Sequence, residues 1–146
     1  MLWTSIIGDQ KVLGPYLEEA QTRAGDTLAF TFDWLEKLNI GHSNPVAGHF
    51  IWCDVRAYLP KFDKHGKKID DPAKQEFELF MRLLNDGNVY VAPGAFYHSQ
   101  IPGFFRLTFT VRREYLKVGF GRVEKIFKQV QKENADLESK MKSLQL

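Results

Sequence analysis

The sequence has little of several features that by themselves assign a protein to a class. It holds a single cysteine, Cys53, so no disulfide can form within the chain, and a reducing compartment is indicated. No apolar run approaches the ~18 residues of a membrane span, and Met1–Gln10 lacks the basic start of a signal peptide. We therefore expect a cytoplasmic protein that does not cross a membrane.

Sequence motifs typical of common catalytic and ligand-binding sites are also absent. The net charge of +2 is too small to indicate nucleic acid or an anionic membrane as a partner. The four histidines and Cys53 match no zinc spacing, and no nucleophile elbow, phosphate-binding loop or dinucleotide fingerprint occurs. We expect no metal site in the chain.

One short stretch, Val118–Val123, resembles an RNA-binding motif. It shares G-F-G-x-V with the aromatic strand of RNA-recognition domains, and Val89–Val91 lies upstream where their other aromatic strand belongs. Arg122 and Lys125, however, stand where stacking aromatic rings are needed. The three- and four-residue spacing of its apolar positions also indicates a helix. We therefore do not expect nucleic acid as a partner.

What the sequence does have is the composition of one packed domain. Its 146 residues are 44% apolar and 26% charged, which is typical of a globular chain with a single core. Aromatic residues make up 14%, with twelve phenylalanines. That content indicates a bulky core or a concealed interface.

The spacing of apolar residues predicts helices and strands in succession. A helical pattern covers about Leu13–Leu38, with Gly14-Pro15 kinking or starting it. The next predicted elements are a strand at His49–Val55 and a charged surface loop at Lys61–Asp71. A helix capped by Asp71-Pro72, with Phe77, Phe80, Leu83 and Leu84 on its buried side, and two short strands within Val89–Val111 complete the middle of the chain.

The last segment shows the most regular pattern, a heptad-like seam. The seam residues are Leu116, Phe120, Val123, Phe127, Val130, Asn134, Leu137, Met141 and Leu144. Core packing explains the first half, whereas the second half could project as a tail or pair with a partner. We predict one domain at residues 1–135, followed by a helical or frayed tail at 136–146. The predicted fold is α+β, with a small mixed or antiparallel sheet covered by helices and long helices at both ends.

A single arginine, Arg106, interrupts the second of the two short strands. At period 2, Phe105, Leu107, Phe109 and Val111 share one face, and Arg106, Thr108 and Thr110 share the other. One interpretation is a solvated outer face. The other is a guanidinium held on a stiff strand to bind a carboxylate or phosphate through two parallel hydrogen bonds.

Three stretches of the chain share motifs with one enzyme family. Tyr16–Arg23 is similar to a long inter-domain helix, and Ala47–Asp54 is similar to an A-G-x-F-x-W-x-D strand. Pro93–Phe96 followed by Pro102–Phe109 is similar to P-G-x-x-F…P-G-W-F-R-x-x-F. Together they resemble the C-terminal small domain of fold-type I (class I/II) aminotransferases that use pyridoxal phosphate. The 1-aminocyclopropane-1-carboxylate synthase-like group is the closest branch, and the resemblance covers about residues 1–130.

The resemblance implies a role for Arg106 and a cofactor. In this family the matching arginine binds the α-carboxylate of an α-amino acid or 2-oxo acid substrate, and the cofactor is pyridoxal 5'-phosphate. The family's large domain, which supplies the Schiff-base lysine, is missing from the sequence. No Ser-x-x-Lys of the family type occurs, so we assign no catalytic or cofactor-binding residue. The helix-like start at Met1 agrees with a fragment cut from a longer parent.

These observations predict the substrate-carboxylate-binding part of an enzyme that performs transamination or synthase-type elimination, inactive as an isolated chain. Phe104, where the synthase pattern has Trp, and Ala95–His98 argue against assigning synthase activity over transamination. The alternative is a non-catalytic interaction module that pairs through Leu116–Leu144, either as a homodimer or with another protein.

Overall fold

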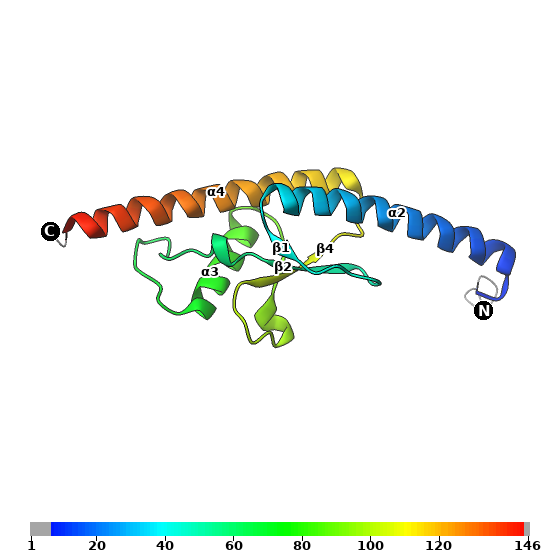
Figure 1. Cartoon of the computed structure of the whole chain (residues 1–146), viewed down its shortest axis with the longest axis horizontal. Helices are drawn as coiled ribbons and strands as arrows, with labels where there is room; N and C mark the ends of the chain where they lie inside the picture. Colours follow the sequence, from blue (N-terminus) through cyan, green and yellow to red (C-terminus); the bar gives the residue numbers. More distant parts are fainter. Residues whose placement is uncertain (1–6, 145–146) are drawn as a thin grey trace.

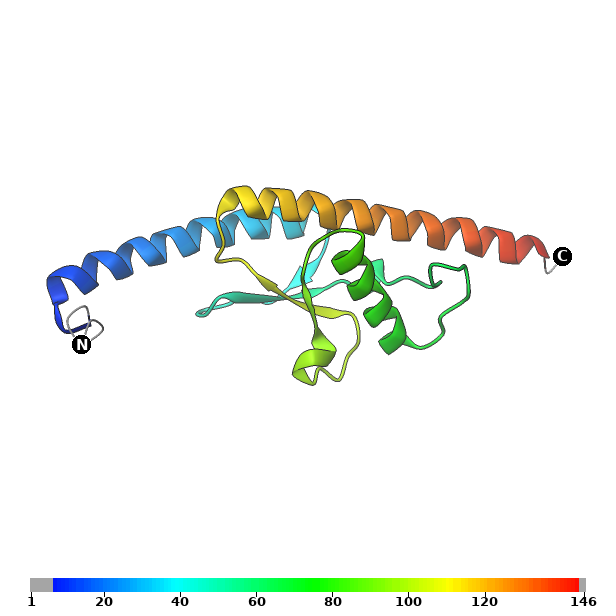
Figure 2. The same ribbon diagram turned by 180° about the vertical axis from the view of Figure 1, so that it is seen from behind.

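Two long helices lie side by side over one face of a small sheet in the computed structural model, which describes residues 7–144 (Figure 1). They are α2 (Gln10–Lys37) and α4 (Arg113–Leu144). A shorter helix, α3 (Pro72–Asn85), packs against α4 and an edge strand of the sheet (Figure 2). The first half of α2 and the end of α4 extend past the sheet in opposite directions (Figure 1). This architecture confirms the predicted α+β class.

The sheet contains four antiparallel strands in the order β1-β2-β4-β3. Their bounds are β1 Gly41–His42, β2 Phe50–Asp54, β3 Ala92–Pro93 and β4 Phe104–Thr108. The strand predicted at His49–Val55 is confirmed as the central strand β2. The first of the two strands predicted within Val89–Val111 is reduced to the two residues of β3, because the chain turns there into the short 3-10 helix η2 (Gly94–Tyr97).

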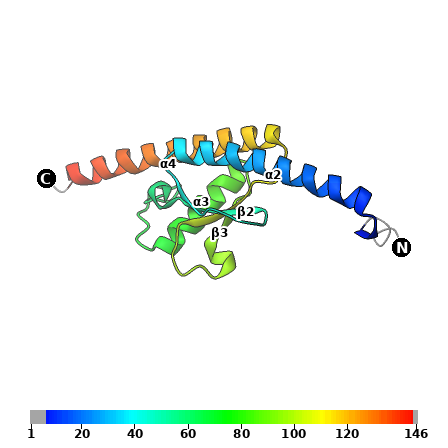
Figure 3. The ribbon, with the colours of Figure 1, turned by 45° about the vertical axis from the view of Figure 1, so that its right-hand side comes forward.

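One face of the sheet is buried beneath α2 and α4 (Figure 3). Ile51, Cys53 and Phe105 are the strand residues of this covered face, and each is at most 4% exposed. The helices complete the core with Leu35, Leu79, Leu83, Val123, Phe127 and Val130. Val111, which was predicted to lie on this face, is 41% exposed, because β4 ends at Thr108 and the chain bends before α4 begins.

Helix α2 begins three residues before the predicted start at Leu13. The side chain of Asp9 accepts a hydrogen bond from the Lys11 amide at 3.0 Å and caps the helix. Pro15 therefore lies inside the helix rather than in its first turn. The predicted apolar face is buried only in the second half of α2, and Leu17 in the first half is 45% exposed.

Helix α3 has the predicted cap at Asp71-Pro72 but a different buried side. Phe80 and Leu83 are buried as predicted, whereas Phe77 is 55% exposed and Leu84 is 36% exposed. Two neighbouring stripes of side chains on α3 fit the helical spacing, and the stripe that packs into the core is not the predicted one. That stripe adds Glu76, Leu79 and Arg82.

The seam of α4 faces the core of its own chain. Its first five residues, Leu116, Phe120, Val123, Phe127 and Val130, are at most 5% exposed. Asn134 binds the backbone that follows η1 (Arg56–Tyr58): its Oδ1 accepts from the Lys61 amide at 2.8 Å, and its Nδ2 donates to the Leu59 carbonyl at 3.0 Å. Further along the seam, Leu137 is half-buried and Met141 is 40% exposed. Intrachain packing thus occupies most of the surface that the interaction-module alternative requires.

Further expectations from the sequence also concern the helices. Val118–Val123 lies within α4, as its spacing predicted, and not on a strand. Helix α4 continues through the stretch from 136 to Leu144. Across residues 7–144, no helix is long and apolar enough to cross a membrane. The helix-like start predicted at Met1 falls mostly outside the described residues.

Candidate functional site

The face of the sheet opposite the long helices carries Arg106. We call it the open face, and its strand residues are Phe50, Trp52, Asp54, Phe104, Arg106 and Thr108. The antiparallel register pairs Arg106 with Trp52, and Phe50 with Thr108. Arg106 and Trp52 are half-buried, and Phe50 is 40% exposed. The alternation predicted from the sequence is therefore confirmed, with Arg106 and the buried Phe105 on opposite faces.

Aromatic rings hold the guanidinium of Arg106. Its Cζ atom lies 4.0 Å from the centroid of the Phe50 ring and 3.8 Å from that of the Tyr97 ring. A cation–π contact contributes about 0.5–1 kcal/mol at an exposed site. Tyr97 also packs edge-on against Trp52, with centroids 5.7 Å apart and rings inclined at 84°. We call Phe50, Trp52 and Tyr97 the aromatic box, and it restricts the orientation of the guanidinium.

Arg106 has no acidic partner among the described residues, because no carboxylate oxygen of residues 7–144 lies within ion-pair distance of it. By contrast, Arg56 pairs with Asp54 at 2.5 Å, and Arg82 pairs with two glutamates. A half-buried guanidinium with its planar set of N–H donors free is suited to bind a carboxylate or a phosphate.

The acidic side chain on the open face, Asp54, is already engaged. The Arg56 side chain donates hydrogen bonds to it at 2.8 and 2.5 Å, and the Arg56 amide donates a third at 3.1 Å. These hydrogen bonds lower the pKa of Asp54, so its carboxylate is ionised at neutral pH. Because Arg56 already pairs with the Asp54 carboxylate, Asp54 is not available as an ion-pair partner for Arg106.

A buried glutamate, which the sequence analysis did not single out, fastens the connection between β3 and β4. Glu76 of α3 is 2% exposed. Its Oε1 accepts a hydrogen bond from the Ala95 amide at 3.0 Å, and its Oε2 accepts one from the Gly103 amide. The sequence gives no clear signal for this role, because a glutamate beside Phe77 in an amphipathic helix is equally consistent with the solvent side.

Tyr97 is the second residue that the sequence analysis missed. It reaches the open face because the connection folds back on itself, with the Ser99 amide donating to the Gly94 carbonyl at 3.1 Å. Gly103 closes the connection with a φ of +93°, and a Cβ there would lie 2.5 Å from the Cγ of Arg56. The Pro-Gly pairs indicate a turn, but they do not show that the turn brings the ring of Tyr97 into contact with Arg106.

The histidines and the cysteine are dispersed over the molecule. His42 stacks on a ring of α2, His49 precedes β2, and His65 and His98 lie in connections. Cys53 is buried in the core, and burial raises its pKa to about 12. In the described part of the chain, no group of three or more His, Cys, Asp or Glu side chains is placed to hold a metal ion.

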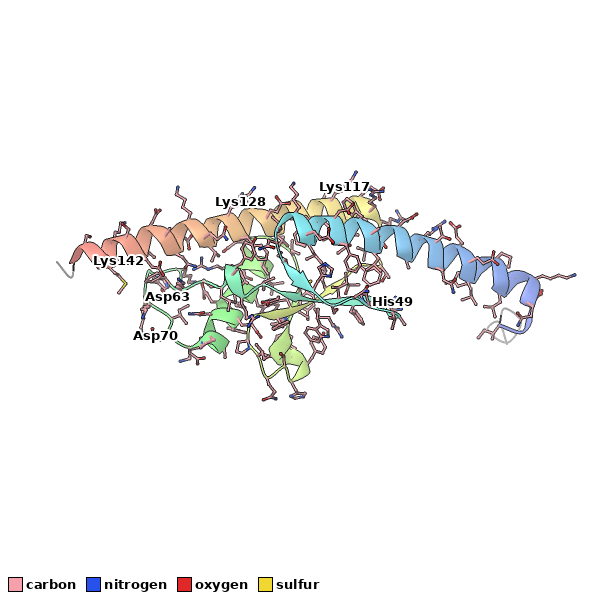
Figure 4. The ribbon with its side chains drawn as sticks, viewed as in Figure 1. His49, Asp63, Asp70, Lys117, Lys128 and Lys142 are labelled. Atoms are coloured by element: carbon pink, nitrogen blue, oxygen red, sulfur yellow. The ribbon has the colours of Figure 1, made fainter. Side chains whose placement is uncertain are left out.

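No residue of the open face is a lysine, so this face offers no amine for attachment of pyridoxal phosphate. The spacing Ser-x-x-Lys does occur at Ser139–Lys142. That segment is exposed near the end of α4, far along the helix from the sheet (Figure 4). The open face by itself therefore offers no attachment point for the cofactor, and its distinctive group is the guanidinium of Arg106.

Comparison with known proteins places these features in a family. The model of aminotransferase class I and II matches residues 2–123. The 1-aminocyclopropane-1-carboxylate synthase 1 of Cucurbita pepo is 31% identical over 108 residues, which are 74% of this chain and 20% of that protein. The 1-aminocyclopropane-1-carboxylate synthase-like protein 1 of Homo sapiens is 31% identical over 111 residues, with coverages of 76% and 20%. The chain thus spans about a fifth of the length of these curated relatives.

The fold agrees with the sequence match. The aromatic aminotransferase from Pyrococcus horikoshii OT3 superimposes with a TM-score of 0.68 at 15% identity, over 88% of this chain and 30% of that one. At that identity the likeness shows the fold alone. Because the family model covers most of the sequence, including the strand that carries Arg106, the chain belongs to the aminotransferase class I and II family.

Proposed function

We propose that this chain is the substrate-carboxylate-binding small domain of a pyridoxal-phosphate-dependent, aminotransferase-like enzyme. The substrate is an α-amino acid or a 2-oxo acid, and the reaction is transamination or synthase-type elimination. One observation carries the proposal. The guanidinium of Arg106 is half-buried, is held by Phe50 and Tyr97, and has no acidic partner among the described residues.

Arg106 contributes binding and orientation. Two parallel N–H···O hydrogen bonds hold a carboxylate in the plane of a guanidinium. The rings of Phe50 and Tyr97 displace water from beside the guanidinium, and a charge interaction strengthens where water is excluded. A fixed carboxylate also fixes the position of the adjoining carbon. Pyridoxal phosphate, when bound, supplies the electron sink for the chemistry at that carbon.

The other half of the site belongs to a large domain outside these 146 residues. The much greater length of the relatives supports this assignment, as does the exposed first half of α2. There Val12, Tyr16 and Leu17 are 50%, 67% and 45% exposed, on the part of the helix that extends past the sheet (Figure 1). Clustered apolar side chains of this kind mark a packing surface. We assign the cofactor lysine to that large domain.

Carboxylate binding by Arg106 can be measured by NMR on the full chain with pyruvate, a 2-oxo acid. The side-chain Nε–H signal of Arg106 should shift on addition of pyruvate. It should not shift with methyl pyruvate, which lacks the carboxylate. A hydrogen bond to a charged group contributes about 1.5–3 kcal/mol, so Arg106→Gln should weaken pyruvate binding roughly tenfold or more.

Arg113 provides a matched control. Its guanidinium also lies over an aromatic ring, 4.5 Å from the centroid of Phe30, but outside the open face. Arg113→Gln removes the same charge and should leave pyruvate binding unchanged. Arg106→Lys keeps the charge but loses the planar fork, so it should bind with intermediate strength. Equal pyruvate affinities for Arg106→Gln and Arg113→Gln would contradict the proposal.

The assignment of the cofactor lysine to another domain has its own test. Mixed with pyridoxal phosphate, the 146-residue chain should show neither a stoichiometric aldimine absorption band nor turnover of an amino acid. One bound cofactor per chain together with turnover would refute the division of the site between two domains.

A further inference from the structure

The connection between β3 and β4 is fastened at both ends by one side chain of another element. The two carboxylate oxygens of Glu76 accept hydrogen bonds from the amides of Ala95 and Gly103. These amides stand at the beginning and the end of the connection, which we call the 94–103 loop. Because Glu76 is 2% exposed, water does not compete effectively for these hydrogen bonds.

The ends of the 94–103 loop are also packed directly against each other. A Cβ at Gly94 would lie 2.7 Å from the carbonyl oxygen of Phe104, so only glycine fits between them. The Ser99 hydroxyl donates to the Ile101 carbonyl at 3.0 Å and further tightens the loop. A loop closed in this way has few alternative conformations, and the side chains that it carries have fixed positions.

Tyr97 is the loop residue that contacts Arg106. Its ring centroid lies 3.8 Å from the guanidinium carbon, closer than that of Phe50 at 4.0 Å. Phe50 is placed by the register of β2 with β4, independently of the loop. The position of the Tyr97 ring, by contrast, depends on the loop conformation, and therefore on the hydrogen bonds that Glu76 accepts.

We propose that Glu76 and Tyr97 are positioning residues of the carboxylate site. Glu76 closes the 94–103 loop, and the closed loop holds the Tyr97 ring against the Arg106 guanidinium. Arg106 then presents its in-plane donors in one orientation, and less side-chain freedom is lost when a carboxylate binds. This inference depends on the proposed function, in which Arg106 binds the carboxylate.

Pyruvate affinity, measured by NMR on the full chain, tests the two residues. Tyr97→Leu should bind pyruvate about threefold to tenfold more weakly, the factor expected for loss of one cation–π contact. Tyr97→Phe keeps the ring and should bind within about twofold of the unmodified chain. Tyr90→Leu is the matched control, because Tyr90 is 64% exposed and packs on Phe80 rather than on Arg106.

Glu76→Gln separates positioning from general loss of structure. The amide side chain can accept from only one of the two backbone N–H groups, so one end of the loop is released. The Arg106 Nε–H signal of the unliganded chain should move, and pyruvate should bind about threefold to tenfold more weakly. In the Tyr97→Leu background, the same change should weaken binding by less than about twofold, because Glu76 acts through Tyr97.

The outcomes distinguish this inference from the proposed function. If Arg106→Gln leaves pyruvate binding unchanged, the proposed function fails, and the inference fails with it. If Arg106→Gln weakens binding as expected but Tyr97→Leu binds as the unmodified chain does, only the inference fails. Additive effects of Glu76→Gln and Tyr97→Leu also overturn it. Tyr97 is 37% exposed, so Tyr97→Leu carries the test even where Glu76→Gln does not fold.

Discussion

The covered and the open face of the sheet are built from the same two strands, yet only one of them is completed by this chain. On the covered face, Ile51 and Phe105 are at most 1% exposed and pack against residues of three helices. On the open face, Phe50 is 40% exposed, and Arg106 has aromatic neighbours but no counter-charge among the described residues. The covered face carries the core, and the open face carries the site that we propose for the substrate carboxylate.

Arg82 and Arg106 show a similar contrast in their charge partners. Arg82 is 7% exposed, and the structure satisfies it internally through Glu78, Glu133 and the carbonyl of Phe62. Arg106 is half-buried, and it has none of these partners within residues 7–144. Arg82 is thus satisfied by acceptors of its own chain, whereas Arg106 is left without an acidic acceptor among the described residues, as the proposed carboxylate-binding role requires.

The sharpest test of the comparison replaces one residue on each face. Phe105→Ala should lower the free energy of unfolding by about 3–5 kcal/mol, the usual cost of a large cavity in a core. Thr108→Ala on the exposed end of the open face should lower it by less than about 1 kcal/mol. Urea unfolding followed by circular dichroism measures both values. Similar losses for the two variants would contradict the conclusion that the covered face carries most of the stability.

A second test exchanges each arginine for methionine, which keeps the length of the side chain. Arg82→Met leaves two glutamates without their shared partner and should destabilise the fold by about 2–3 kcal/mol, below the full cost of breaking a buried pair because both carboxylates are partly exposed. Arg106→Met should cost about 1–2 kcal/mol, from the two lost cation–π contacts. Its pyruvate binding should nevertheless be lost, whereas a folded Arg82→Met chain should retain it.

The smallest expected effect is a pH dependence from Glu133, the α4 partner of Arg82. Burial opposes ionisation of Glu133, but hydrogen bonds from Gln129 and Arg82 outweigh it and hold the pKa of Glu133 below its ordinary value of 4.5. The unfolded chain therefore binds more protons near this pH, and stability falls as the pH drops through and below that value. Glu133→Gln should lose about 0.5–1 kcal/mol at neutral pH and flatten the acid part of the curve. Parallel stability–pH curves for the two chains would contradict this account.

Period-2 alternation allowed the sequence to predict the face of Arg106, and the helical spacing predicted the seam from Leu116 to Val130. Both follow from local geometry, in which one strand or one helix sets which side chains share a side. The cap at Asp71-Pro72 was predictable for the same reason, because its hydrogen bond closes within two residues.

The start of α2 was missed because of a local feature, the Asp9 cap, whereas the incorrect burial in α3 and the two missed site residues depend on contacts between distant segments. Phe77 and Leu84 were placed in the core because their spacing fits a helix face, but tertiary packing selected the stripe through Leu79 instead. Tyr97 meets Arg106 only through the closure of the 94–103 loop. Glu76 meets that loop only after α3 has packed beside β3. No pattern within a single segment contains these relationships.

Cys53 and Trp52 are adjacent on β2 but lie on opposite faces, and together they provide the chain with two built-in reporters. The Cys53 thiol is 4% exposed, and burial raises its pKa to about 12, so a thiol reagent at neutral pH reacts only with molecules that have opened. Trp52 packs against Tyr97 in the aromatic box, so its emission should respond to a carboxylate bound at Arg106, provided that Trp3 and Trp34 are replaced by Phe so that Trp52 alone emits. Labelling rate and emission can thus be recorded on one sample of the Trp3→Phe, Trp34→Phe chain, and they distinguish opening of the molecule from binding at the open face.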